Sequence, residues 1–161
     1  MKRISLLLLL LITAAGGYAQ SISFYDLTNL TNLTDGEAHT YLTLGKVFKQ
    51  QYVEEVGGKR LERFTTINNK VKPQNITIGV KEILSNGTVL HTVTYETFDP
   101  QHIVNMIGQA KRAKLIMKFQ GVDANNNIYL FDNDFYSVAM YISVKDSRGL
   151  VKINQKDFTS N

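Results

Sequence analysis

The chain has 161 residues, of which 43% are hydrophobic, and it carries 18 basic residues, 14 acidic residues and no cysteine. The lack of cysteine excludes disulfides and a lipid-modified cysteine, so the chain must rely on a hydrophobic core of its own, for which its length suffices. Setting aside Lys2 and Arg3 leaves 16 basic and 14 acidic residues, a net charge of +2 that is too small to indicate binding to nucleic acid or to an anionic membrane.

The first 19 residues have the pattern of a cleavable signal peptide. Two basic residues come first, Leu6–Leu11 is an unbroken apolar run, and Gly17 and Ala19 occupy the −3 and −1 positions if cleavage falls before Gln20. The apolar stretch is shorter than the about 20 residues that a spanning helix needs, and no later segment reaches that length. We therefore expect residues 1–19 to be removed and the protein to be exported, periplasmic or secreted, which fits a bacterial envelope.

The segment that follows is polar. Residues 20–36 are rich in Asn and Thr and contain Asp35-Gly36, which predicts a leader segment. No low-complexity linker divides the remainder of the chain. We therefore expect a single β-rich globular domain over residues 37–161.

Residues 37–50 fit two kinds of structure. Thr34 and Glu37 have the spacing of a capping box, and apolar residues then recur at helical intervals. Threonine, glycine and valine, which are poor helix formers, lie between them, so two short strands fit the same residues. Residues 47–56 favour a strand because a hairpin turn follows.

Two glycine-containing turns predict β-hairpins. Gly57-Gly58 supplies the positive φ angles of a tight two-residue turn, and Asn86-Gly87 is the strongest short hairpin signal. Apolar residues alternate with polar ones on both sides of the second turn, as in half-buried strands. The strands that these turns connect are expected at residues 51–56, 59–67, 76–80 and 89–96.

An amphipathic helix is expected over residues 100–112. Asp99 is a good N-cap, and Pro100 occupies the first helical position, where proline is preferred. One apolar stripe runs along the segment, formed by Ile103, Met106, Ile107 and Ala110. The helix is therefore expected to pack on a sheet.

After this helix, alternating apolar residues and turns rich in Asp, Asn and Gly predict a meander. Its strands are expected at residues 115–119, 128–131, 135–144 and 150–153. The predicted fold class is therefore α+β, mainly antiparallel β, as a curled sheet or a small barrel with the helix near 100–112 packed on it. A two-helix α+β sandwich is the alternative if residues 37–50 are helical.

No motif for catalysis or metal binding is present. His91 lies on an apolar alternating face, and His39 and His102 lack partners at metal-ligand spacing. The segment from Asp123 begins like a calcium loop, but Ile128 stands where that loop needs glycine. Serine-nucleophile motifs and phosphate-binding glycine loops are also absent. The sequence therefore assigns no catalytic residue, no metal ligand and no cofactor.

Aromatic residues late in the chain offer a binding surface as well as core packing. The candidate ligand or partner surface comprises His91, Tyr95, Phe131, Phe135 and Tyr141. The sequence favours an exported, non-catalytic binding or interaction domain of the cell envelope or extracellular space, whose partner is another protein or a small apolar ligand. One alternative is a small-ligand carrier with a β-lined apolar cavity. The other is a hydrolase whose site the fold assembles, with His91 or His102 beside a carboxylate.

Overall fold

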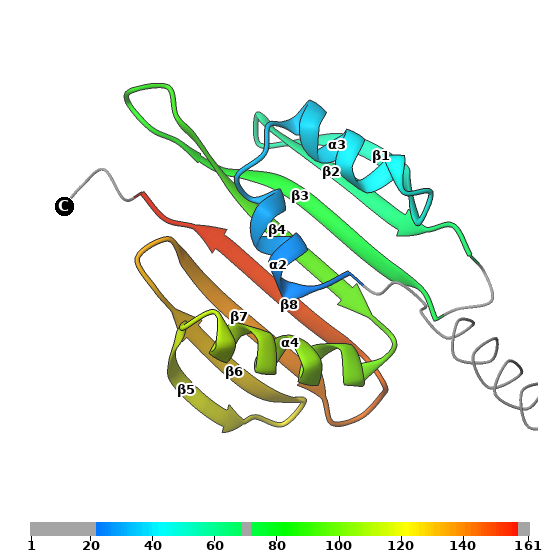
Figure 1. Ribbon diagram of the computed structural model, residues 1–161, viewed down its shortest axis with the longest axis vertical. Helices are drawn as coiled ribbons and strands as arrows, with labels where there is room; N and C mark the ends of the chain where they lie inside the picture. The colour runs from blue at the N-terminus through cyan, green and yellow to red at the C-terminus, as the bar shows by residue number, and fades with distance from the viewer. Residues whose placement is uncertain (1–21, 69–71, 158–161) are drawn as a thin grey trace, which may run out of the picture.

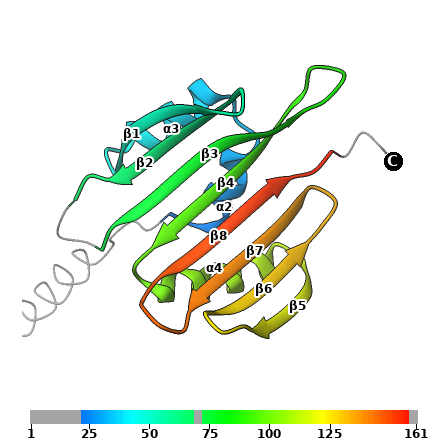
Figure 2. The ribbon, with the colours of Figure 1, turned by 180° about the vertical axis from the view of Figure 1, so that it is seen from behind.

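The computed structural model describes residues 22–68 and 72–157, and the predicted signal peptide lies outside these residues. The described chain forms one eight-stranded antiparallel sheet with three helices on one of its faces (Figure 1). The view from behind shows the strands with no helix in front of them (Figure 2). The predicted α+β class with a mainly antiparallel sheet is confirmed, but the sheet stays open and does not close into the small barrel considered from the sequence.

The helices are α2 (Phe24–Leu30), α3 (Asp35–Leu44) and α4 (Pro100–Arg112). The first four strands are β1 (Phe48–Val56), β2 (Lys59–Thr66), β3 (Gln74–Ile83) and β4 (Val89–Thr97). The last four are β5 (Ile116–Val122), β6 (Asn126–Asp132), β7 (Tyr136–Ser143) and β8 (Gly149–Gln155).

The order of strands across the sheet is β1-β2-β3-β4-β8-β7-β6-β5. Each half of the chain contributes a helix followed by a four-stranded meander: α3 with β1–β4, and α4 with β5–β8. The two meanders join through their last strands, because β4 pairs antiparallel with β8 from Thr92↔Asn154 to Thr97↔Gly149. Of all the pairings, the one at the centre of the sheet therefore joins the strands that lie farthest apart in the sequence. The first strand of each meander forms an edge of the sheet.

The strongest local signals of the sequence are confirmed. α4 begins after the N-cap Asp99, whose carboxylate accepts a hydrogen bond from the Gln101 N–H, and ends at Arg112. The β1–β2 turn has φ of +59° at Gly57 and +72° at Gly58, and the β3–β4 turn has φ of +83° at Gly87. These left-handed conformations cost glycine little, which explains why both hairpins could be predicted.

The ambiguous segment over residues 37–50 divides into a helix and the start of a strand. Thr34 and Glu37 form the predicted capping box, and α3 continues to Leu44. Lys46 then takes a φ of +52° and the chain enters β1 at Phe48. The strand favoured for residues 47–56 is confirmed. In the residues before it, a helix forms instead of a strand because the capping box satisfies two N–H groups at the helix start.

The expected leader segment is corrected by the structure. Residues 24–30 form α2, which starts with its own capping box between Ser23 and Asp26. Its apolar residues lie three positions apart, so one face of the short helix is buried: Phe24, Leu27 and Leu30. This segment is therefore part of the folded domain, and its polar residues lie on the other side of the helix.

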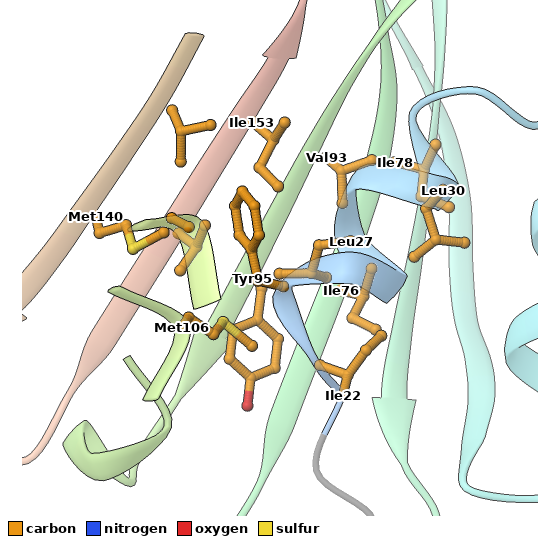
Figure 3. Packing of buried hydrophobic residues seen from close by; sticks show 14 of the residues in the cluster. Ile22, Leu27, Leu30, Ile76, Ile78, Val93, Tyr95, Met106, Met140 and Ile153 are labelled. Carbon is orange, nitrogen blue, oxygen red and sulfur yellow. The ribbon is translucent and has the colours of Figure 1, made fainter. Parts of the chain in front are cut away.

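The core lies between the helix layer and the sheet. α3 packs on β1, α4 packs on β7 and β8, and α2 lies on β4 and against α4. Figure 3 shows the side chains of α2 among those of the central strands, with Met106 of α4 beside Tyr95. α2 therefore fills the space over the join between the two meanders.

Candidate functional site

The face of the sheet opposite the helices is open to solvent, and we call it the open face (Figure 2). Directly paired residues of an antiparallel sheet share a face, so the register assigns its members. In β4 the buried Val93 and Tyr95 point to the helices, so Thr94 and Glu96 belong to the open face. The open-face side chains of the six inner strands are mostly half-buried by their neighbours.

The open face has an apolar half on β5–β8. Register pairs such as Phe119↔Leu130 and Tyr141↔Leu150 place apolar side chains across neighbouring strands. The apolar side chains of this half are Ile116, Phe119, Ile128, Leu130, Ala139, Tyr141 and Leu150, and the same register places Asp132, Ser137, Lys152 and Asn154 on this face beside them. Ile116 is 60% exposed and Phe119 is 48% exposed, so apolar surface reaches the edge of the sheet.

The other half, on β2–β4, is polar. Threonine and asparagine side chains pair across the strands in Thr65↔Asn75 and Thr77↔Thr94. Arg63 and Glu96 form an ion pair across this half, with 2.6 Å between Nη2 and Oε2. Water solvates these groups well, so the two halves present different chemistry to a partner.

Both edges of the sheet are interrupted by β-bulges. The register of β1 shifts between Gln50 and Tyr52, and that of β5 shifts between Met117 and Phe119. A bulge twists an edge strand and makes it a poor template for another strand. The open face is therefore a better candidate for an interaction surface than either edge.

A hollow of about 560 Å³ lies at one end of the open face, where β4 ends and β8 begins. We call it the polar hollow. It is lined by the aromatic side chains of Phe98 and Tyr141, by several Asn, Ser and Thr residues, and by three cationic and two anionic side chains. Arg63 and Arg148 are two of these cations, and each forms an ion pair with a carboxylate of the same hollow.

The structure separates the five residues predicted as a ligand or partner surface. Tyr141 is half-buried on the open face and also lines the polar hollow. Phe135 is 51% exposed in the β6–β7 turn, with its ring centroid 6.2 Å from that of Tyr136. These two side chains lie on different parts of the molecule and do not form one site.

The remaining three residues are a correction, because their side chains face the interior. Tyr95 and Phe131 are core residues with 0% and 2% exposure, and His91 is 8% exposed. The His91 Nδ1 lies 3.2 Å from the Thr31 carbonyl oxygen, and its Nε2 lies 3.6 Å from the Asp35 carboxylate. His91 therefore links β4 to the α2–α3 connection, and none of the three presents a surface to a partner.

His102 belongs to a buried network around Tyr95. The Tyr95 hydroxyl donates to the Gln74 side-chain carbonyl at 3.0 Å and lies 2.9 Å from the His102 Nδ1. The Thr97 hydroxyl is 3.3 Å from the same nitrogen, and the Asp99 carboxylate is 3.9 Å from Nε2. Burial raises the pKa of the Tyr95 hydroxyl above its ordinary range. Both hydroxyl groups are buried, with 0% exposure for Tyr95 and 1% for Thr97.

Sequence reasoning missed the pair with the shortest distance between a histidine nitrogen and a carboxylate in the described part of the chain. His39 Nδ1 on α3 lies 2.7 Å from the carboxylate of Glu62 on β2, which is 4% exposed. The Gln50 amide donates to the same carboxylate at 2.6 Å, and Arg60 is 3.6 Å from it. Glu62 lies two residues before the buried Phe64 and so shares the buried face of β2, and a carboxylate at such a position was the available signal. The pair fixes α3 on the sheet.

A second hollow, of about 320 Å³, lies where α2 and α3 meet the start of β1. The Tyr41 hydroxyl donates a hydrogen bond to the Asp26 carboxylate at its wall. Partial burial by itself would raise the pKa of Asp26, but hydrogen bonds from Ser23 and Tyr41 hold it below its usual value. The bond to Asp26, together with burial and the negative charge, raises the pKa of Tyr41 to about 12.

This pair predicts a loss of stability at alkaline pH. A raised pKa in the folded state means that the contribution of Tyr41 is complete below its ordinary pKa of 10.0 and disappears as the pH rises through about 12. Tyr41→Phe is therefore expected to be less stable than wild type at pH 8, and the difference is expected to shrink between pH 10 and 12. The urea midpoints of both proteins, measured at each pH, give this difference in stability. The other titrating groups are common to the two proteins, so their contributions cancel. A constant difference would show that the hydrogen bond does not contribute.

Within residues 22–68 and 72–157, no cluster of three or more His, Asp or Glu side chains is placed to hold a metal ion. None of the helices in this described part of the chain is long and apolar enough to cross a membrane. The turn from Asp123, which begins like a calcium loop, is an Asx turn in which its carboxylate accepts the N–H groups of Asn125 and Asn126 at 2.7 and 2.6 Å.

Comparisons of the chain with protein-family models, with curated proteins and with solved structures return no match.

Proposed function

We propose that the protein is an exported, non-catalytic binding domain, and that the apolar half of the open face binds another protein. The observation that carries the proposal is the one-sided covering of the sheet. Three helices lie on one face, while apolar side chains of β5–β8 remain half-exposed on the other. Contiguous exposed apolar surface with a polar surround is characteristic of interaction sites.

Two features favour a protein partner over the alternatives. The space between helices and sheet is filled by buried aromatic and aliphatic side chains, among them Phe24, Phe64 and Phe131, which argues against an enclosed apolar cavity for a carrier. The hydroxyl groups nearest His102 are buried, which argues against a hydrolase. An exposed apolar area carried by paired strands suits a protein surface, since little ordering of the backbone is needed on binding.

Site-specific photo-crosslinking in an exporting bacterial host tests the proposal. A photoreactive amino acid at Leu130, on the open face, is expected to capture a partner protein. The same amino acid at Val104, which is 48% exposed on α4, is the control and is expected to capture none. Crosslinks from Val104 alone would place the contact on the helix side and contradict the proposal.

The captured partner is then purified and titrated against variants. Leu130→Asp and Tyr141→Ala are expected to weaken its binding about tenfold or more, because each removes apolar contact area from the open face. Val104→Asp is expected to leave the affinity unchanged. Unchanged affinity in both open-face variants would contradict the assignment of this surface.

A further inference from the structure

We propose that the polar hollow binds a neutral oligosaccharide. The hollow lies between the end of β4 and the β7–β8 loop, and it shares Tyr141 and Leu150 with the apolar half of the open face. Its volume of about 560 Å³ falls in the range of small-ligand sites, roughly 300–1,000 Å³. The proposal goes beyond a protein contact on the open face and does not depend on it.

Two aromatic side chains give the hollow its apolar contacts. Phe98 follows the last residue of β4 and is 45% exposed, and Tyr141 lies on β7. The face of an aromatic ring is apolar, and a pyranose ring presents a flat face of C–H groups to such a surface. Aromatic residues left exposed inside a polar site are otherwise unfavourable, and a stacked sugar ring would cover them.

The charges of the hollow almost cancel, which selects against a charged ligand. Arg63 pairs with Glu96 and Arg148 with Asp146, each at 2.6 Å between nitrogen and oxygen. The remaining cation, Lys145, donates to the Asn125 side-chain carbonyl at 2.5 Å. A phosphate or carboxylate would meet two carboxylates in the same space, which costs binding energy.

Paired charges and amides suit hydroxyl groups for a second reason. A sugar hydroxyl donates one hydrogen bond and accepts others, so its site needs donors and acceptors close together. Guanidinium and carboxylate groups side by side, with the amides of Asn75 and Asn125, supply both kinds. Hydrogen bonds to charged groups are also stronger than those between neutral groups.

The backbone of the β7–β8 loop beside the hollow is held by hydrogen bonds. The Asp146 N–H and the Lys145 N–H both donate to the Ser143 hydroxyl at 3.2 Å. The Val144 N–H donates to the Asn125 carbonyl at 2.8 Å, which joins the β5–β6 turn to the β7–β8 loop. A site fixed in this way loses little conformational entropy on binding.

Titration calorimetry with defined sugars tests the proposal. The probes are the β-1,4-glucose, α-1,4-glucose, β-1,4-mannose, β-1,4-xylose and N-acetylglucosamine hexasaccharides, with inorganic phosphate and hexagalacturonate as charged comparisons. At least one neutral hexasaccharide is expected to bind, and the charged probes are expected not to. No binding of any neutral probe up to about 10 mM, or tighter binding of a charged probe, would overturn the proposal.

Variants locate the binding. Phe98→Ala and Tyr141→Ala are expected to raise the Kd of the neutral sugar about tenfold, since each removes a stacking surface. Phe135→Ala, in the β6–β7 turn, is the matched aromatic control and is expected to leave Kd unchanged. Equal Kd values in Phe98→Ala and wild type, with both proteins folded by circular dichroism, would overturn the site. Phe98 lies outside the apolar half, so its variant separates this proposal from the protein contact.

Discussion

Replacing Leu27 with alanine is expected to lower the free energy of unfolding by about 3 kcal/mol. Leu27 is fully buried in α2, among the side chains of the central strands (Figure 3). Truncation removes apolar contacts and leaves a cavity where α2 covers the join between the two meanders, and the surrounding sheet cannot collapse to fill it. Urea denaturation of the mature protein, followed by circular dichroism, measures the change.

Asn29→Ala is the matched control, because Asn29 is exposed on the other side of the same helix. The free energy of unfolding of this variant is expected to stay within about 0.5 kcal/mol of the wild-type value. A Leu27→Ala variant as stable as wild type would mean that residues 24–30 contribute nothing to the fold and act as the leader segment that their composition indicates.

Replacing Gly149 with alanine is expected to destabilise the protein by about 2 kcal/mol. Gly149 is the buried first residue of β8, directly under α4. A Cβ at this position would overlap the Cγ1 of Ile103 and lie 3.0 Å from its Cδ1, with Thr97 Cγ2 at 3.3 Å. Ile103 is fully buried, so either its side chain or α4 must shift to accept the methyl group.

Gly36→Ala is the control for this glycine. Gly36 lies in the first turn of α3, and a Cβ there would meet no atom within 4 Å. Gly36→Ala is expected to leave the free energy of unfolding unchanged or to raise it by up to about 1 kcal/mol, since alanine favours a helix. The variant Ile103→Ala/Gly149→Ala completes a double-mutant cycle, in which strong coupling is expected. Additive effects of the two substitutions would show that the close approach of α4 to β8 does not cause the destabilisation by Gly149→Ala.

The sequence alone determined the elements that local chemistry specifies. Asp99 satisfies an unpaired N–H group at the start of the helix, and Pro100 has no N–H group to satisfy. The apolar stripe of the helix can pack on any apolar surface and does not specify which one. Gly57, Gly58 and Gly87 mark turns that require positive φ. These signals act over a few residues and do not depend on the remainder of the chain.

Short elements were harder to recognise. α2 has 7 residues, too few for a helical period to be visible against polar neighbours. Its capping box at Ser23 and Asp26, followed by apolar residues at three-residue spacing, was the signal that the composition concealed. An isolated helix of this length is unstable in water, so its formation depends on the core that it covers.

The candidate site was the least predictable part. Alternation identified the strands around His91, Tyr95 and Phe131, but it does not say which of the two faces a helix will cover. That choice depends on the position of all three helices on the same side of the sheet, and it buried these three residues while leaving Tyr141 half-exposed.

Only the tertiary structure decided how distant segments meet. The pairing of β4 with β8 joins residues 92–97 to residues 149–154, and it turns two local meanders into one sheet. It also brings Phe98 to the same hollow as Tyr141 and Arg148. Caps and turns are fixed by the backbone chemistry of neighbouring residues, whereas strand order and the covered face follow from burying the most apolar surface over the whole chain.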